Sequence, residues 1–105
     1  MDFRAKYNTN FRAKYKDRIN TIKVKELKEG DLMYLTSGCA TDWCIARFTR
    51  HFDTVNDSHK KVTGVQGIKI LDLDGDNDRE NVICTFMCDD LESLVEVIDA
   101  IPMGI

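Results

Sequence analysis

Most of the chain alternates between apolar and polar residues in short runs, which is the pattern of β-strands that bury one face. The runs cover residues 22–25, 32–35, 43–52, 62–73 and 81–88. In the third run, Cys44, Ala46 and Phe48 would lie on one face, and Ile45 and Arg47 on the other. The sequence therefore predicts about five strands.

Turn residues between these runs indicate how the strands connect. The segment DGDN at residues 74–77 is the strongest turn signal in the chain. Residues 62–73 and 81–88 are therefore predicted to form an antiparallel hairpin. Gly64 and Gly67 lie within the first of these strands and indicate a bulge or a bend.

The apolar spacing changes near the C-terminal end of the sequence. Apolar residues recur there at intervals of three and four, at Leu91, Leu94, Val95, Ile98 and Ile101. This spacing is typical of an amphipathic helix, and Asp89 with Glu92 would cap its first turn. We expect a helix over residues 89–101, ended by Pro102 and Gly104.

A basic and aromatic arm is expected over residues 1–20. It contains the repeat FRAKY at residues 3–7 and 11–15. On a helix the rings would form one stripe that continues to Ile19, whereas on strands the repeats alternate and could form a hairpin. Arg, Ala and Lys favour a helix from residue 10 to residue 18, with Thr9 or Asn10 as its cap.

Together these elements predict a mainly β protein with some α structure (α+β). Residues 21–105 would form one small domain, a strongly bent antiparallel sheet or an SH3-like or OB-like barrel with a C-terminal helix. Residues 24–35, a strand, an EGD turn and a second strand, resemble the opening of many SH3-like barrels. A chain of 105 residues holds one domain, since domains usually contain roughly 50 to 200 residues.

Composition excludes several classes of protein. With 43% hydrophobic and 31% charged residues, one Pro and six Gly, the chain has the composition of a folded globular protein. No apolar run approaches the ~20 residues that cross a bilayer, and no secretory signal begins the sequence. We expect a cytoplasmic protein with no membrane partner, whose four cysteines are reduced.

The net charge of −3 conceals a strong polarity along the chain. Lys and Arg outnumber Asp and Glu by nine to four in residues 1–29, whereas residues 70–105 hold one basic and ten acidic residues. The basic arm could therefore lie on the acidic C-terminal surface of its own chain or of a neighbouring copy. A homodimer stays open as an alternative.

Residues 72–80, DLDGDNDRE, form the densest acidic segment. Their spacing resembles the DxDGDxxxD calcium loops of integrin-type propeller repeats. That resemblance implies calcium as a cofactor, with ligands at Asp72, Asp74, Asp76 and Glu80. The alternative is a solvated hairpin turn in a protein with no cofactor.

Neither a zinc site nor catalysis is indicated. Cys84 and Cys88 share one face of a predicted strand, where they would pack in the core, and Cys39 is the more exposed thiol. His51 and His59 have no partner that completes a nucleophile–base pair. No glycine motif that binds phosphate occurs. We therefore expect that the protein is not an enzyme.

The leading hypothesis is a non-enzymatic binding protein, an accessory or inhibitor protein whose size and lack of motifs resemble those of small phage proteins. An acidic face would engage a basic surface on a protein partner. That face comprises Asp72, Asp74, Asp76, Asp78, Glu80, Asp90, Glu92 and Glu96.

Two alternatives remain. The first is a nucleic-acid-binding module, because Arg and Lys contact phosphates and aromatic rings stack on bases. Its residues would be Arg4, Lys6, Tyr7, Arg12, Lys14 and Tyr15. An aromatic stripe is equally typical of packing against a sheet. The second alternative is a calcium-dependent binding module based on residues 72–80.

Overall fold

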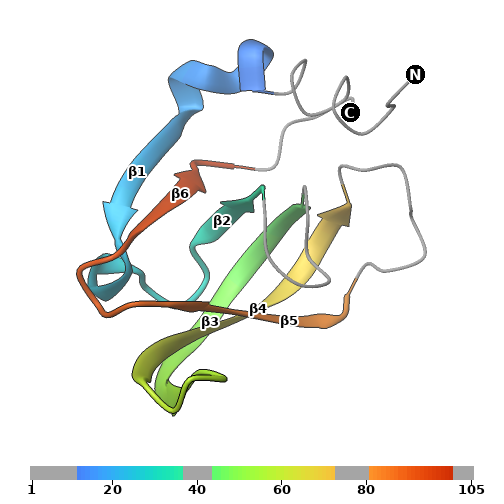
Figure 1. Ribbon diagram of the computed structural model, residues 1–105. Helices are drawn as coiled ribbons and strands as arrows, with labels where there is room; N and C mark the ends of the chain where they lie inside the picture. The colour runs from blue at the N-terminus through green and yellow to red at the C-terminus, as the bar shows by residue number, and fades with distance from the viewer. Residues whose placement is uncertain (1–11, 37–43, 73–80, 101–105) are drawn as a thin grey trace, which may run out of the picture.

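The computed structural model describes residues 12–36, 44–72 and 81–100 of the chain (Figure 1). Residues 12–15 are helical and continue into the 3-10 helix η1 (Lys16–Arg18); a second 3-10 turn is η2 (Val24–Glu26). The strands are β1 (Ile19–Lys23), β2 (Leu32–Leu35), β3 (Cys44–Val55), β4 (Lys61–Asp72), β5 (Ile83–Cys88) and β6 (Leu94–Ile98). The prediction of a mainly β protein is confirmed.

All six strands form one antiparallel sheet in the order β1-β6-β2-β3-β4-β5. β6 lies between the two strands that come first in the chain, as Figure 1 shows. Ile22 of β1 pairs with Val95 on one side of β6, and Met33 of β2 pairs with Val97 on the other. The sheet therefore joins β1 to β2 only through β6.

The predicted hairpin between residues 62–73 and 81–88 is confirmed as β4 and β5, in which Val65 pairs with Phe86. β3 and β4 are the longest strands, with 12 residues each, and residues 56–60 connect them. Within this connection the side chain of Asn56 accepts hydrogen bonds from the backbone N–H groups of Ser58 and Lys60.

The sheet bends strongly at Gly67, the second glycine of β4. The β3–β4 register shifts between Phe48 and Arg50, opposite Gly67. A Cβ atom on Gly67 would lie 2.7 Å from the backbone oxygen of Arg47, so only glycine allows the strands to approach this closely. In Figure 1, β5 crosses in front of β3 and β4, so the sheet folds back over its own inner face.

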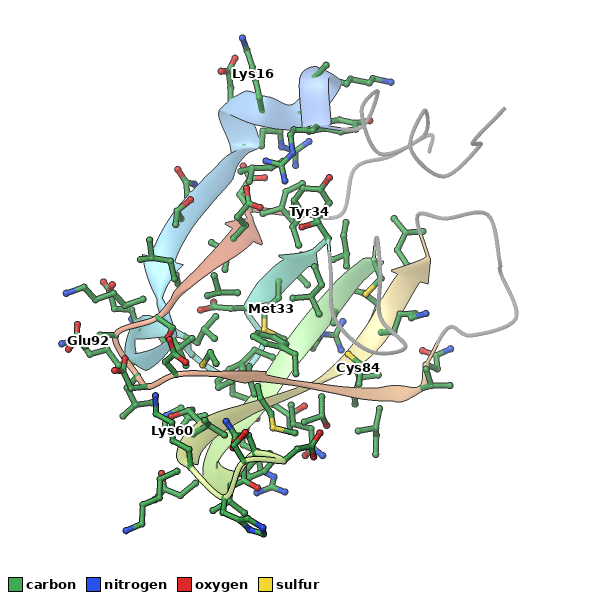
Figure 2. The ribbon with its side chains drawn as sticks, in the orientation of Figure 1. Lys16, Met33, Tyr34, Lys60, Cys84 and Glu92 are labelled. Atoms are coloured by element: carbon green, nitrogen blue, oxygen red, sulfur yellow. The ribbon has the colours of Figure 1, made fainter. Side chains whose placement is uncertain are left out.

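The main core lies inside this bend. Its buried residues come from η2, from the residue that follows η2 and from five of the strands: Val24, Leu27, Met33, Leu35, Cys44, Ala46, Phe48, Val65, Cys84 and Val95. Met33 is fully buried in the middle of the molecule (Figure 2). The predicted inner face of β3 is therefore confirmed.

A smaller cluster of Tyr15, Tyr34, Ile45 and Ile98 packs separately, near the helical segment. Figure 2 shows Tyr34 at the end of the sheet that this segment covers. The helix predicted over residues 10–18 is confirmed for residues 12–18. Tyr15 and the partly buried Ile19 bring the aromatic stripe onto the sheet.

The helix expected over residues 89–101 is wrong, because this segment contains β6. β6 has a buried residue on each face: Val95 belongs to the main core, whereas Ile98 belongs to the smaller cluster. A strand that buries residues on both faces has apolar residues at mixed spacings, and these matched a helical period by coincidence. Leu91 and Leu94, which the helix would bury, are 38% and 68% exposed.

The sheet has six strands instead of about five, because β6 takes the place of the expected helix. Within the ranges that the structure describes, no strand pairing joins β1 to β5, so closure into an SH3-like or OB-like barrel is not observed. Ile101, Pro102 and Gly104 lie outside the described residues.

We predict that Gly67→Ala lowers the free energy of unfolding by about 1–3 kcal/mol. The added methyl group would have to displace the Arg47 carbonyl oxygen or the Met33 side chain, at 2.7 and 2.8 Å. Urea denaturation followed by circular dichroism measures the loss. Thr49→Ala, at an exposed position of β3, is the control and should change stability by less than about 0.5 kcal/mol. Equal losses in both variants would contradict this account of the bend.

Candidate functional site

Two arginines near the N-terminal end of the described chain bind carboxylates at its C-terminal end. Arg12 forms a bidentate ion pair with Glu96, with N–O distances of 2.8 and 2.9 Å. Nε of Arg18 donates a hydrogen bond to Asp99 at 2.8 Å. Donating these hydrogen bonds to Glu96 also raises the pKa of Arg12 above its ordinary value. The basic segment therefore lies on the acidic surface of its own chain.

A second ion-pair group joins the end of β1 and η2 to the segment before β6. Nζ of Lys23 and Nζ of Lys25 lie 2.8 and 2.7 Å from the two carboxylate oxygens of Glu92. Hydrogen bonds from Lys23 and then Lys25 lower the pKa of Glu92 to about 2. Backbone bonds hold the segments in register, since the N–H of Val24 donates to the Ser93 carbonyl at 2.8 Å. Figure 2 places Glu92 at this outer corner.

The aromatic residues of the described arm pack against the protein. Tyr15 is 9% exposed, and burial raises the pKa of Tyr34 above its ordinary value. The Arg12 guanidinium lies 5.1 Å from the centre of the Tyr34 ring, and Nζ of Lys14 lies 5.4 Å from that of Tyr15. The described residues of the predicted nucleic-acid surface, Arg12, Lys14 and Tyr15, therefore contact other residues of their own chain. Arg4, Lys6 and Tyr7 lie outside the described residues.

An acidic cavity lies at the opposite end of the sheet, beside the β3–β4 turn that Lys60 marks in Figure 2. Its volume is about 570 Å³. It brings three carboxylates and one ammonium group together with apolar side chains, and its lining comprises Asp53, Thr54, Val55, Lys61, Val62, Thr63, Asp89 and Asp90.

Strand register explains why these residues meet. Asp53 pairs with Thr63, and Thr63 pairs with Cys88, so the three side chains form a row across β3, β4 and β5. Asp90 follows Cys88 by two positions, and its carboxylate accepts a hydrogen bond from the backbone N–H of Glu92 at 2.8 Å. Thr63 is 6% exposed, and its hydroxyl has no hydrogen-bond partner among the residues that the structure describes.

The carboxylates of the cavity differ from those beside the arm. Across residues 12–36, 44–72 and 81–100, neither Asp53 nor Asp89 forms an ion pair, and Lys61 forms none. No group of three or more His, Cys, Asp or Glu side chains in these ranges is arranged to hold a metal ion. The cavity therefore offers separated carboxylates beside apolar walls made by Val55 and Val62.

The described cysteines are free thiols, as expected. Cys84 is buried in the main core and the partly buried Cys88 packs against this core, which confirms their predicted packing. Cys44 is buried in the same core. A hydrogen bond with Cys44 lowers the pKa of Cys84, and the charge of Lys69 acts in the same direction. Burial raises the pKa of Cys88, and the charge of Asp90 adds to this effect. Cys39 lies outside the described residues.

A second cavity of about 550 Å³ lies beside β1, β2 and β6, and Asn20, Asp31, Arg47 and Asp99 contribute its polar groups. Its carboxylates already have donors. Asp31 accepts a hydrogen bond from the Lys28 backbone N–H at 2.8 Å, and Asp99 binds Arg18. The acidic cavity is therefore the stronger candidate for binding a cation.

The structure separates the acidic residues that the sequence grouped into one face. Asp90 lines the acidic cavity, whereas Glu92 and Glu96 lie elsewhere and bind basic residues of the same chain. The side chain of Asp72 and residues Asp74, Asp76, Asp78 and Glu80 lie outside the described residues, so the calcium loop stays a prediction. Sequence reasoning missed Asp53. It counted Asp89 with the acidic C-terminal segment and as a helix cap, and nothing in the sequence indicated that Asp89 and Asp53 would line one cavity.

The low pKa of Glu92 gives a pH dependence with a definite sign. Its folded pKa of about 2 lies below the ordinary 4.5, so the ionised group stabilises the fold above about pH 4.5 and loses this effect as the pH falls toward 2. We predict that wild type melts at a higher temperature than Glu92→Gln near pH 6, and that the difference vanishes near pH 2. Differential scanning calorimetry measures both melting temperatures.

The control for this experiment is Glu29→Gln, at an exposed glutamate that forms no ion pair within the described chain. The difference in melting temperature between Glu29→Gln and wild type should not shrink as the pH falls. High salt at pH 6 should also reduce the effect of Glu92→Gln, because exposed ion pairs are screened. If the melting temperatures of Glu92→Gln and wild type differ equally near pH 6 and near pH 2, the low pKa of Glu92 is refuted.

No helix in the described ranges is long and apolar enough to cross a membrane. No protein-family model, curated protein or solved structure matches the chain. Charge, burial and strand register are therefore the grounds on which a function can be proposed.

Proposed function

We propose that the protein is a non-enzymatic binding protein that holds a protein partner by a basic side chain placed in the acidic cavity. The observation that carries this proposal is the group Asp53, Asp89 and Asp90 around one space of about 570 Å³. Asp53 and Asp89 have no cationic partner in the described chain. A cation from another molecule would give these two carboxylates an ion-pair partner.

The chemistry of the lining favours arginine or lysine over a small cation. These side chains combine an apolar stem with a charged head, so the stem would contact Val55 and Val62 while the head reaches the carboxylates. The guanidinium of arginine donates several hydrogen bonds in a fixed plane, and separated carboxylates match it better than they match a metal ion. The buried hydroxyl of Thr63 would supply one further acceptor.

The position of the cavity supports a protein partner over nucleic acid. Arg12 and Arg18 bind Glu96 and Asp99, so phosphates would have to compete with carboxylates for the same guanidinium groups. Asp53, Asp89 and Asp90 would repel phosphates, but they would attract and orient a basic protein surface. A small protein that covers a basic site on a larger one would act as an accessory or inhibitor protein.

We predict that N-acetylarginine amide binds in the cavity. In an NMR titration, the amide signals of residues 53–55, 61–63 and 89–90 should shift in the wild-type protein. The shifts should be lost in the triple variant Asp53→Asn, Asp89→Asn, Asp90→Asn, because the charges that attract the guanidinium are gone. The matched control is Asp17→Asn, Glu29→Gln, Asp57→Asn, which removes the same charge from exposed positions outside the cavity. Equal shifts in both triple variants would refute the site.

Affinity capture from the native host then tests the class of partner. The proposal expects a protein that stays bound after nuclease and chelator treatment, is lost with the cavity variant and is kept with the control variant. Loss on nuclease treatment would favour the nucleic-acid alternative. Loss on chelation would favour the calcium-dependent alternative.

A further inference from the structure

The two edges of the sheet differ in how they are protected. β1 (INTIK) presents polar residues, including Lys23, and such charges discourage a further strand from pairing with an edge. β5 (ICTFMC) contains neither a charged residue nor a proline, in a chain in which 31% of residues are charged. Among the described residues, β4 is the only strand that pairs with β5. Within the described ranges, β5 is therefore an edge strand with no charged residue or proline to discourage pairing.

The outer face beside this edge is apolar and exposed. Ile83 is 70% exposed and Met87 is 56% exposed, the first and fifth residues of β5. Ile68, which pairs with Ile83, is 39% exposed and extends the same surface onto β4. Gly64 pairs with Met87 and has no side chain to cover it. This patch belongs to neither core cluster.

The hydrogen bonds between β4 and β5 show which backbone groups of β5 point away from β4. The carbonyl of Val82 accepts a hydrogen bond from the Lys69 N–H of β4 at 2.8 Å. The N–H and C=O groups of one residue in a strand point to the same side, and successive residues alternate. Ile83, Thr85 and Met87 therefore direct their backbone groups away from β4. The residues with the exposed side chains are those with available backbone groups.

We propose that two copies of the chain form a symmetric dimer by pairing their β5 edges in antiparallel fashion, with Thr85 on the twofold axis. In this register Ile83 of one copy lies opposite Met87 of the other. Three residue pairs, Ile83 with Met87, Thr85 with Thr85 and Met87 with Ile83, each exchange two backbone hydrogen bonds. The exposed apolar side chains of the two copies then cover one another.

The symmetry of this uncharged, apolar edge selects a second copy as the occupant. Each chain carries a net charge of −3, but residues 83–88 are uncharged, so the axis opposes no like charges. The exposed apolar residues also lie evenly about the axis, since Ile83 stands two positions before Thr85 and Met87 two positions after it. The surface is thus self-complementary, as a twofold interface requires.

Sedimentation velocity over a concentration series tests the dimer. Wild type should shift from monomer to dimer as its concentration rises. Met87→Lys adds an edge charge, and Thr85→Pro removes the N–H nearest the axis; each should raise the dimer Kd at least about tenfold. Leu94→Lys makes the same apolar-to-charged change at a 68% exposed residue of β6 and should keep the wild-type Kd. Circular dichroism confirms that the variants fold.

Amide hydrogen exchange tests the register. In the dimer, the N–H groups of Ile83, Thr85 and Met87 should become protected as concentration rises, whereas those of Cys84 and Phe86 bond to β4 in either state and should not change. A wild-type protein that stays monomeric at NMR concentration overturns the proposal. A dimer that persists in both Met87→Lys and Thr85→Pro, or that protects other strands instead, overturns it equally.

Discussion

The structure depends on the bend of a single sheet. The described chain has no second layer that could cover an apolar face, so the sheet must cover its own inner surface. Gly67 makes this possible by letting β4 approach the Arg47 backbone, and the fully buried Met33 fills the space inside. The same bend carries β5 across the front of the molecule (Figure 1). It also leaves the turn end of β3 and β4 beyond the core, where the acidic cavity forms.

Electrostatics divides the molecule into two ends. At one end the N-terminal cations neutralise the carboxylates around β6, and these contacts hold the helical segment on the sheet. At the other end Asp53 and Asp89 have no such partners in the described chain. The basic N-terminal part and the acidic C-terminal part of the sequence thus form one surface whose charges are neutralised, and a separate surface stays acidic. Asp53 and Asp89 can therefore attract a cation without first breaking an internal ion pair of the described chain.

The sequence was informative where one face of a strand is buried. Alternation correctly predicted the inner residues of β3, and the turn signal at residues 74–77 correctly predicted the β4–β5 hairpin. The prediction failed at β6, where Val95 and Ile98 enter different clusters and the alternation disappears. The acidic cavity was beyond prediction for another reason. Asp53 and Asp89 are far apart in the chain, and only the pairing of Thr63 with both neighbouring strands brings them together.

The position of β6 also determines when the fold can be completed during synthesis. β1 and β2 leave the ribosome early, yet neither gains its shared neighbour until β6 has followed them. The β3–β4–β5 ladder, by contrast, contains only neighbours in sequence and can form while translation continues. The nascent chain should therefore contain a partly formed sheet in which β1 is still unpaired. The sheet is completed when β6 inserts between β1 and β2.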